Sequence, residues 1–295
     1  MKIPKIKYLF IIFLFPIIGQ AQLSDLARID YTFLPEGDSD IEYHRFRALF
    51  NYPVKLNEGT YLFLGLDYSN IDLKFGNDFS AFNEEKLEDF QLLDLNIGYT
   101  TKISKNWRLG VRITPGVSSN LTVNELSIED IVLSGDLVFI NDKKQAPDVR
   151  KPYRIIVGIS YSENRGFPFP LPFISYYRKI HPKWSYNIGV PKTNLQFHYS
   201  DRHRLKAYTE LDGFTSNIQQ GMDLGNGVTA ESINMSLIVS GLQYEYHFLD
   251  HFQFYFRAAY IASNSVYLRD NNKDRILSLG NSNKKYFRAG IRLKI

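Results

Sequence analysis

The sequence predicts an all-β protein: a single closed antiparallel transmembrane β-barrel of 14 strands, or 12 in the alternative, with short periplasmic turns and longer extracellular loops. Three observations predict this fold class. Apolar and polar residues alternate with a period of two from residue 26 to the end of the chain. Short and long connections interleave between these segments, and an export signal precedes them. After residue 22 no apolar run approaches the roughly 18 residues of a membrane-spanning helix.

The N-terminus has the layout of a secretory signal peptide. Three lysines and no acid occupy the first seven residues, "YLFIIFLFPII" follows, and the small residues Gly19 and Ala21 precede Gln22. We therefore expect residues 1–21 to be a cleaved signal peptide and residues 22–295 to be a barrel domain in the outer membrane of a Gram-negative bacterium. A short N-terminal anchor is the alternative for residues 1–21.

The composition excludes several classes of protein. The chain has no Cys, which excludes disulfides and a lipid-attached N-terminal cysteine. Once the signal is removed, 32 basic and 31 acidic residues remain, and no basic patch indicates nucleic acid as a partner. The 20 Tyr and 22 Phe, against 2 Trp, favour strands and lipid interfaces.

Segments rich in Val, Ile, Phe and Tyr mark the strands in order. The first pair is "LARIDYTFL" and "EYHRFRALFNYPV", and "GTYLFLGLDYSNIDLKF" starts at the glycine of the turn "NEG". In each of these segments the apolar residues lie on one face of the strand. The seven strand candidates of the first half are residues 26–34, 42–54, 59–75, 90–103, 107–117, 130–140 and 153–162.

The second half begins with three short candidates. Two of them, "WSYNIGV" and "NLQFHYS", have seven residues each, whereas a spanning strand needs roughly 9 to 11. The terminal candidate, "KYFRAGIRLKI", alternates apolar and mostly basic residues, and we expect it to close the barrel against the strand near residue 27. The seven candidates of this half are residues 173–180, 184–190, 194–200, 205–214, 233–248, 252–262 and 285–295.

The connections alternate in length along the chain, as they do in antiparallel outer-membrane barrels. The connection at residues 141–152 is an exception, because it is long but falls on the side of the short turns. The short connections are residues 57–59, 104–106, 181–183, 200–203 and 249–251, and the long polar ones are residues 76–89, 118–129, 215–231 and 263–283.

The polar face of the strands carries charges of both signs. A charge that faces lipid at the bilayer midplane costs about 2–4 kcal/mol, so we expect these side chains to face the lumen. They either form a structural salt-bridge network that fills the lumen or line a path for ions or solutes. The predicted lumen-lining residues are Arg28, Asp30, Arg45, Arg47, Asp67, Asp94, Arg108, Arg112, Asp136, Arg154, Glu210, Glu245, Arg257, Arg288 and Arg292.

Aromatic residues recur where the apolar faces meet the short turns. Membrane barrels place such rings at the headgroup level, whereas ordinary packing near hairpins is the alternative. The recurrence at one end of the strands favours an aromatic girdle of Trp107, Tyr153, Trp184, Phe248 and Phe252.

Three segments together resemble an uncharacterised family of Gram-negative outer-membrane β-barrel proteins, a domain of unknown function. They are "ARIDYTFLP", "KWSYNIGVPK" and the terminal strand "KYFRAGIRLKI". The resemblance implies an outer-membrane barrel whose partners are outer-membrane lipid and the barrel-insertion machinery, and it supplies no activity. The chain departs from the usual insertion signal, which ends in an aromatic residue, because its last residue is Ile295.

No motif indicates catalysis, a metal site or a cofactor. The sequence lacks the patterns of zinc proteases, serine hydrolases and phosphate loops. His198 and Ser200 lie two apart on one strand face, as in outer-membrane lipases, but that face points to the lumen and the pair lies beside a turn. Asp270 and Asp274 suggest either a surface calcium site or a solvated loop.

The stretch "RGFPFPLPF" is unusually apolar for a connection. Because proline cannot donate to a strand ladder, we expect an extended loop instead of an interior strand. The loop could fold into the barrel mouth, lie on the membrane, meet a partner or pack over the rim. Its apolar residues are Phe167, Pro168, Phe169, Pro170, Leu171 and Pro172.

Three classes of function follow from this reading. The first is an outer-membrane channel or transporter for a small solute. A hydrophobic solute is one option, with the short strands at 184–200 forming a low wall and a lateral opening into the bilayer. The second is a structural or interaction barrel with a salt-bridge-filled lumen and no transport. An outer-membrane hydrolase is the third and the least supported, so the sequence favours a protein that is not an enzyme.

Overall fold

A computed structural model describes residues 25–36, 41–76, 85–123, 125–144, 151–280 and 285–294. The expected signal peptide, residues 1–21, lies outside these described residues. In the described part of the chain, no helix is long and apolar enough to cross a membrane.

The described residues are almost entirely strands. The elements are β1 (Ala27–Leu34), β2 (Ile41–Asn57), β3 (Thr60–Phe75), α1 (Glu85–Glu88), β4 (Asp89–Lys102), β5 (Arg108–Ser119), η2 (Ile128–Asp130), β6 (Ile131–Asp142), β7 (Tyr153–Ser162), β8 (Leu171–His181), β9 (Trp184–Val190), β10 (Lys192–His198), β11 (His203–Asp223), β12 (Thr229–His247), β13 (Phe252–Arg269), β14 (Arg275–Gly280) and β15 (Lys285–Leu293).

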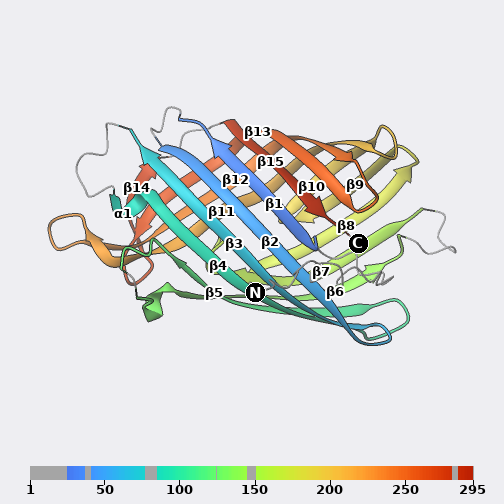
Figure 1. Cartoon of the computed structure of the whole chain (residues 1–295), viewed down its shortest axis with the longest axis horizontal. Helices are drawn as coiled ribbons and strands as arrows, with labels where there is room; N and C mark the ends of the chain where they lie inside the picture. Colours follow the sequence, from blue (N-terminus) through green and yellow to red (C-terminus); the bar gives the residue numbers. More distant parts are fainter. Residues whose placement is uncertain are drawn as a thin grey trace, which may run out of the picture.

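The strands form one closed antiparallel barrel (Figure 1). Each strand from β1 to β13 pairs with the next, and β15 pairs with both β13 and β1. The ring therefore has the predicted 14 strands, and the terminal strand closes it as expected, with Ala27 opposite Leu293. β14 is an additional strand that pairs with β13 beyond β15, inside the segment 263–283 that the sequence analysis read as a loop.

The barrel has two distinct ends. One, here called the turn end, carries short connections such as the two residues between β2 and β3. The opposite end, here called the loop end, carries α1, η2 and β14 (Figure 1). The β11–β12 hairpin extends furthest there, because β11 and β12 continue to Asp223 and from Thr229. The predicted loop 215–231 is thus mostly strand.

The outer surface of the barrel is apolar and its inner face is polar, the reverse of a soluble protein. In β4 the two classes alternate residue by residue: Leu93, Leu95 and Ile97 are exposed, whereas Asp94 and Asn96 are buried. This alternation is the period of two in the sequence. It places one face of each strand toward the interior of the closed ring.

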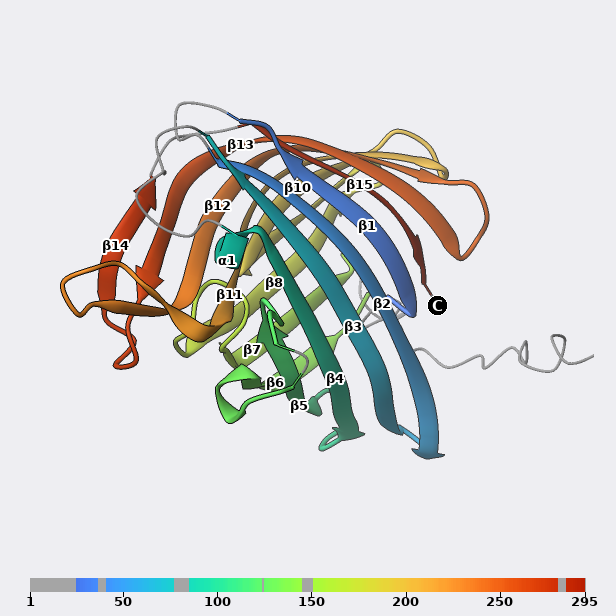
Figure 2. The same cartoon turned by 60° about the vertical axis from the view of Figure 1, so that its left-hand side comes forward.

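Toward the loop end the inward face changes from charged to apolar. In β2, Ile41 and Tyr43 share a face with Arg45, and all three are buried. Leu87 of α1 is also fully buried in this apolar cluster, and Figure 2 shows α1 within the opening of the barrel. Because β1–β4 and β11–β15 supply the cluster, the loop-end half of the lumen on that side is a packed core.

β9 and β10 are shorter than their neighbours, as the sequence predicts. β8 pairs with β9 only from Ile174 onward, and β10 pairs with β11 only as far as Glu210. Leu171 and Pro172 belong to β8, whereas the sequence analysis assigned them to a loop. Proline is tolerated there because this part of β8 lacks a β9 partner and forms an edge.

Beyond β10, the free edge of β11 is completed by distant segments. The Leu211 amide donates to Pro191 O at 3.0 Å and the Thr215 amide donates to Asn164 O at 3.2 Å. Further along, Asn217 pairs with Ser119 of β5, a strand that is not its neighbour in the ring. β5 and the β7–β8 connection therefore replace the missing length of β10.

Gly213 lies between these contacts, and only glycine fits there. Its φ is 136°, and an added Cβ would lie 2.0 Å from Met235 O. Gly166 of the β7–β8 connection approaches the same place, because its own Cβ would lie 3.0 Å from the Gly213 Cα. The two glycines allow the connection to cross β11 closely.

We expect Gly213→Ala to lower the free energy of unfolding by about 1–3 kcal/mol, because it combines a strained φ with a backbone clash. Urea titration of the refolded barrel in detergent, followed by gel mobility of unheated samples, measures the effect. Gly225→Ala is the matched control, since its φ is also positive (+85°) but no atom lies within 4 Å of the added Cβ. An equal loss in both variants would contradict the close-approach account.

Candidate functional site

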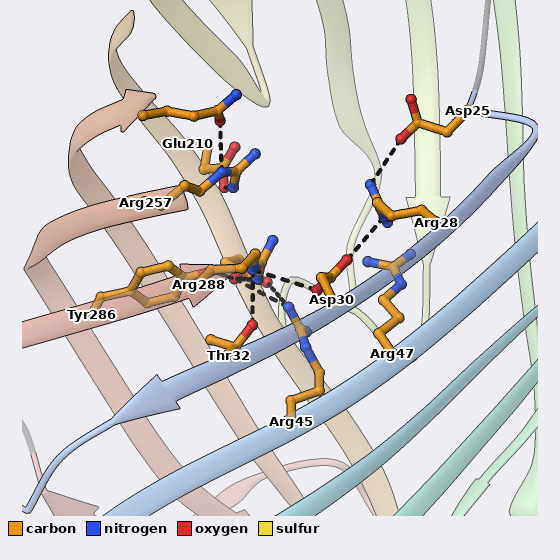
Figure 3. A network of polar contacts seen from close by, with 12 residues as sticks. Asp25, Arg28, Asp30, Thr32, Arg45, Arg47, Glu210, Arg257, Tyr286 and Arg288 are labelled. Carbon is orange, nitrogen blue, oxygen red and sulfur yellow. Dashed lines mark hydrogen bonds and ion pairs between the residues drawn. The ribbon is translucent and has the colours of Figure 1, made fainter. Parts of the chain in front are cut away.

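The centre of the lumen holds a charged cluster around Asp212 of β11. Its carboxylate accepts from Arg45 Nη2 at 3.1 Å, Arg288 Nη2 at 2.6 Å and the Tyr286 hydroxyl at 2.8 Å. Figure 3 shows Arg45 of β2 approaching Tyr286 and Arg288, which both belong to β15. Because β2, β11 and β15 are not neighbours in the ring, these contacts cross the barrel interior.

A first branch of the network runs from this centre toward the turn end. Arg288 Nε donates to Thr32 Oγ1 at 2.8 Å and lies 3.7 Å from Asp30 Oδ1. Asp30 in turn pairs with Arg28 at 3.0 Å, and Arg28 with Asp25 at 3.4 Å (Figure 3). β1 and β15 are thereby joined by inward side chains as well as by their backbone ladder.

A second branch lies on β10–β13. Glu210 pairs with Lys192 at 2.5 Å and with Arg257. Arg257 Nε donates to Gln243 Oε1 at 2.7 Å, and the Gln243 amide donates to Glu245. Glu245 also pairs with two bases nearer the turn end, Lys206 at 2.6 Å and Arg292 at 3.8 Å.

The remaining predicted lumen charges lie outside these branches. Arg47 binds Asp67 through two bonds of 2.8 and 2.5 Å, and Arg112 pairs with Asp136. Asp94 accepts from Asn164 at 2.8 Å, Arg108 donates to Gly59 O at 2.8 Å, and Arg154 lies opposite Asp142 in the ladder. The structure therefore gathers charges from β1, β2, β10–β13 and β15 in one network. Arg47 and the predicted lumen charges of β3–β7 have separate local partners.

Two network members were missed in the sequence. Lys192 follows Pro191 and was read as part of a turn, yet it begins β10 and shares the face of Asn194 and Gln196. Tyr286 lies with Arg288 on the polar face of the terminal segment, but it is not among the predicted lumen-lining residues. The alternation with a period of two identifies both, because Lys192 lies two residues before Asn194 and Tyr286 lies two residues before Arg288.

The predicted girdle residues all lie at the turn end. Trp107 directly precedes β5, Tyr153 and Trp184 begin β7 and β9, and Phe248 and Phe252 flank the β12–β13 turn. Phe248 and Phe252 contact each other, with ring centroids 5.7 Å apart. Aromatic contacts that the sequence analysis did not single out connect Trp184 to Phe248, through Phe197, Tyr199, His203 and Tyr246.

The catalytic and calcium candidates from the sequence contact other partners in the structure. His198 Nε2 contacts Ser185 Oγ at 2.9 Å, whereas Ser200 Oγ accepts from the backbone of its own turn. Asp270 Oδ1 accepts from the Asp274 amide at 2.9 Å, so it caps a tight turn. Among the described residues, no group of His, Cys, Asp and Glu could hold a metal ion.

A pocket of about 190 Å³ lies in the wall where the β9–β10 hairpin ends. We call it the notch; its lining is Gly189, Val190, Pro191, Thr193, Thr209, Glu210 and Leu211. Glu210 belongs to the lumen network, whereas Thr193 and Thr209 are exposed on the outer face. The notch is therefore part of the wall itself, between the lumen and the outer surface.

We expect Asp212→Asn to lower the free energy of unfolding by about 3–5 kcal/mol, because Arg45 and Arg288 lose a buried counter-charge. Urea titration of the refolded barrel measures the loss. Glu42→Gln is the control, since Glu42 pairs with Lys74 where the two side chains are 26% and 62% exposed, and such pairs contribute at most about 1 kcal/mol. Similar losses in both variants would show that the cluster does not stabilise the barrel.

Several solved structures are similar over most of the chain. The KdgM porin in complex with disordered oligogalacturonate is 8% identical with a TM-score of 0.37, covering 91% of this chain and 99% of that one. A TodX mutant, a monoaromatic hydrocarbon channel, is 10% identical with a TM-score of 0.42, covering 91% and 88%. LpxR from Salmonella typhimurium is 8% identical with a TM-score of 0.39, covering 91% and 99%. Among curated proteins, none matches the sequence.

A family model described as a domain of unknown function, DUF6268, matches residues 38–294. The match extends from the segment before β2 to the residue after β15, which is most of the chain. It confirms the resemblance to an uncharacterised family. This chain belongs to the DUF6268 family.

Proposed function

We propose that this barrel lies in the outer membrane of a Gram-negative bacterium and passes a small hydrophobic or amphiphilic solute between its lumen and the bilayer. The apolar outer surface supports the membrane location, because exposed Leu and Ile side chains such as Leu95 and Ile113 cover strands around the ring. The aromatic residues at the turn end, including Trp184 and Phe252, support a membrane boundary there.

The notch is the observation that carries the transport proposal. It lies where the short β9–β10 hairpin ends. Beyond this level, no part of β9 or β10 separates β8 from β11. Val190, Pro191 and Leu211 give it apolar walls, and Glu210 connects it to the lumen network. An apolar solute that reaches this level could leave sideways without crossing the charged centre.

The loop-end core favours a lateral route over an axial one. Phe214 of β11 and Phe90 of β4 are buried with their ring centroids 5.7 Å apart, which places packed side chains across the interior. The contact of Ser118 Oγ with Thr215 O, at 2.8 Å, ties β5 to β11 at the same end. A solute that passed along the axis on this side would have to displace both.

The same core favours a second candidate, a structural barrel with a filled lumen and no transport. The apolar core at the loop end and the ion-pair network next to it stabilise a closed barrel whether or not a solute passes through it. Its distinguishing property is that it would leave the permeability of the outer membrane unchanged.

Uptake of the hydrophobic dye N-phenyl-1-naphthylamine by intact Gram-negative cells tests the proposal. Cells that produce the chain should take up the dye faster than cells that lack it. Thr209→Trp should return uptake to the background rate, because the indole ring fills the notch from its outer side. Dye fluorescence over time, at matched amounts of heat-modifiable barrel, gives the rates.

Leu195→Trp is the matched control. Leu195 lies on the outer face of β10, two residues from Thr193, and its side chain is 45% exposed. It does not line the notch. This variant should keep the wild-type rate. If wild-type and barrel-free cells take up dye equally, transport is contradicted and the structural barrel is favoured.

A further inference from the structure

The turn end of the lumen gathers basic side chains on the inner face of the wall. Five of them belong to β7, β8, β11 and β15, and the sixth is the last described residue. All are partly exposed inside the barrel: Arg154, Lys179, Arg204, Lys206, Arg292 and Lys294. We call this group the vestibule. Lys206 lies within Coulombic range of Arg204 and Arg292, and Lys294 lies within the same range of Arg292 and Lys206.

The vestibule charges act on one another across the lumen and not only between neighbouring strands. His198 of β10 lies within range of Lys179 on β8 and of Arg204 and Lys206 on β11. Lys144, which follows β6, lies within range of Lys206, although four strands of the ring separate β6 from β11. The basic groups therefore surround a common interior space.

Carboxylates in the described residues neutralise only part of this charge. Glu245 is shared by Lys206 and Arg292, with contacts of 2.6 and 3.8 Å. Asp142 acts on Arg154, and Asp25 acts on Lys294. Arg204 lies opposite Glu245 in the ladder, but neither Arg204 nor Lys179 forms an ion pair within 4.0 Å among the described residues. Six bases thus face three nearby carboxylates, and the vestibule retains a net positive charge.

Several buried donors in the vestibule also lack a hydrogen-bond acceptor. The Nε atoms of Arg154, Arg204 and Arg292 have no hydrogen-bond partner among the described residues, and neither does Arg292 Nη2. Buried guanidinium groups normally bind carboxylate or phosphate oxygens. Glu245 Oε2 is an unpaired acceptor in the same region, but the free donors outnumber it, and a carboxylate or phosphate would match them in charge and geometry.

We propose that the vestibule binds the anionic group, a carboxylate or phosphate, of the solute that uses the notch. This inference rests on the proposed transport function and assigns the charge of its substrate. Lys206 and Glu210 lie four residues apart on β11, about 14 Å along the strand. A solute with an anionic head and an apolar chain would place its head among the vestibule bases and its chain toward Val190 and Leu211.

Binding of the trianionic dye 8-hydroxypyrene-1,3,6-trisulfonate tests the vestibule directly. Fluorescence anisotropy is measured with the barrel in nanodiscs of zwitterionic lipid, which do not themselves attract anions. The wild-type barrel should bind the dye at low ionic strength and release it as salt screens the charges. Lys179→Gln with Arg204→Gln should weaken binding about tenfold, because two short-range charge contacts are lost.

Lys105→Gln with Lys183→Gln is the matched control, since it removes the same charge from exposed turns at the same end of the barrel. It should change affinity by less than about twofold, because exposed charges are screened. Equal weakening by both double variants, or no binding by the wild-type barrel at low salt, would overturn the proposal.

The wild-type barrel gives a second readout that needs no variant. Inorganic phosphate should compete with the dye, whereas the non-aromatic cation choline, added as its chloride at the same ionic strength, should compete no more than sodium chloride does. Competition by both ions equally would also overturn the proposal. This assay needs no transport, so failure of dye uptake in cells with intact anion binding would contradict the transport route and leave the vestibule in place.

Discussion

The shortness of β9 and β10 is the constraint on which the rest of the loop end depends. These strands have 7 residues each, whereas β11 has 21, so β11 continues well past its β10 partner. A strand edge cannot stay unpaired at membrane depth, because each free backbone group costs several kcal/mol. Asn164 and the end of β5 supply the missing partners. At this place, distant segments take over the role of the missing part of β10. The close approach at Gly213 and Gly166, the apolar core and the notch all lie there.

The charged centre and the notch meet on the same stretch of β11. Glu210 lines the notch and pairs with Lys192 and Arg257, and Asp212, two residues further, is the carboxylate that Arg45 and Arg288 share. The network therefore holds β11 in place at the level where its neighbour ends. The filled lumen and the short wall beside it are compatible, because buried ion pairs and the ladder with β12 both hold β11 where its β10 partner ends.

The sequence predicts the barrel well and its interior less well. All 14 barrel strands lie near the predicted positions, because the period of two is strong where one face is apolar and exposed and the other carries charges such as Asp94 and Arg288. The prediction fails at the loop end. There Ile41, Tyr43, Ile71 and Leu73 are apolar on the inward face, so polarity no longer separates the two sides, and β14 was read as part of a loop. The ion-pair partners were also beyond the sequence, since Arg45 and Asp212 are 167 positions apart and only the closed ring brings them together.

The most direct test of the notch uses the absence of natural cysteines from the chain. Thr209 and Ala207 both lie on the outer face of β11, but only Thr209 lines the notch. With each barrel in lipid vesicles, the rate of labelling by a membrane-impermeant maleimide is measured for Thr209→Cys and Ala207→Cys. If the notch joins the lumen to the outer surface, Thr209→Cys should react at least about tenfold faster, because water reaches it from inside. Equally slow labelling of both variants would contradict a lateral opening in this wall.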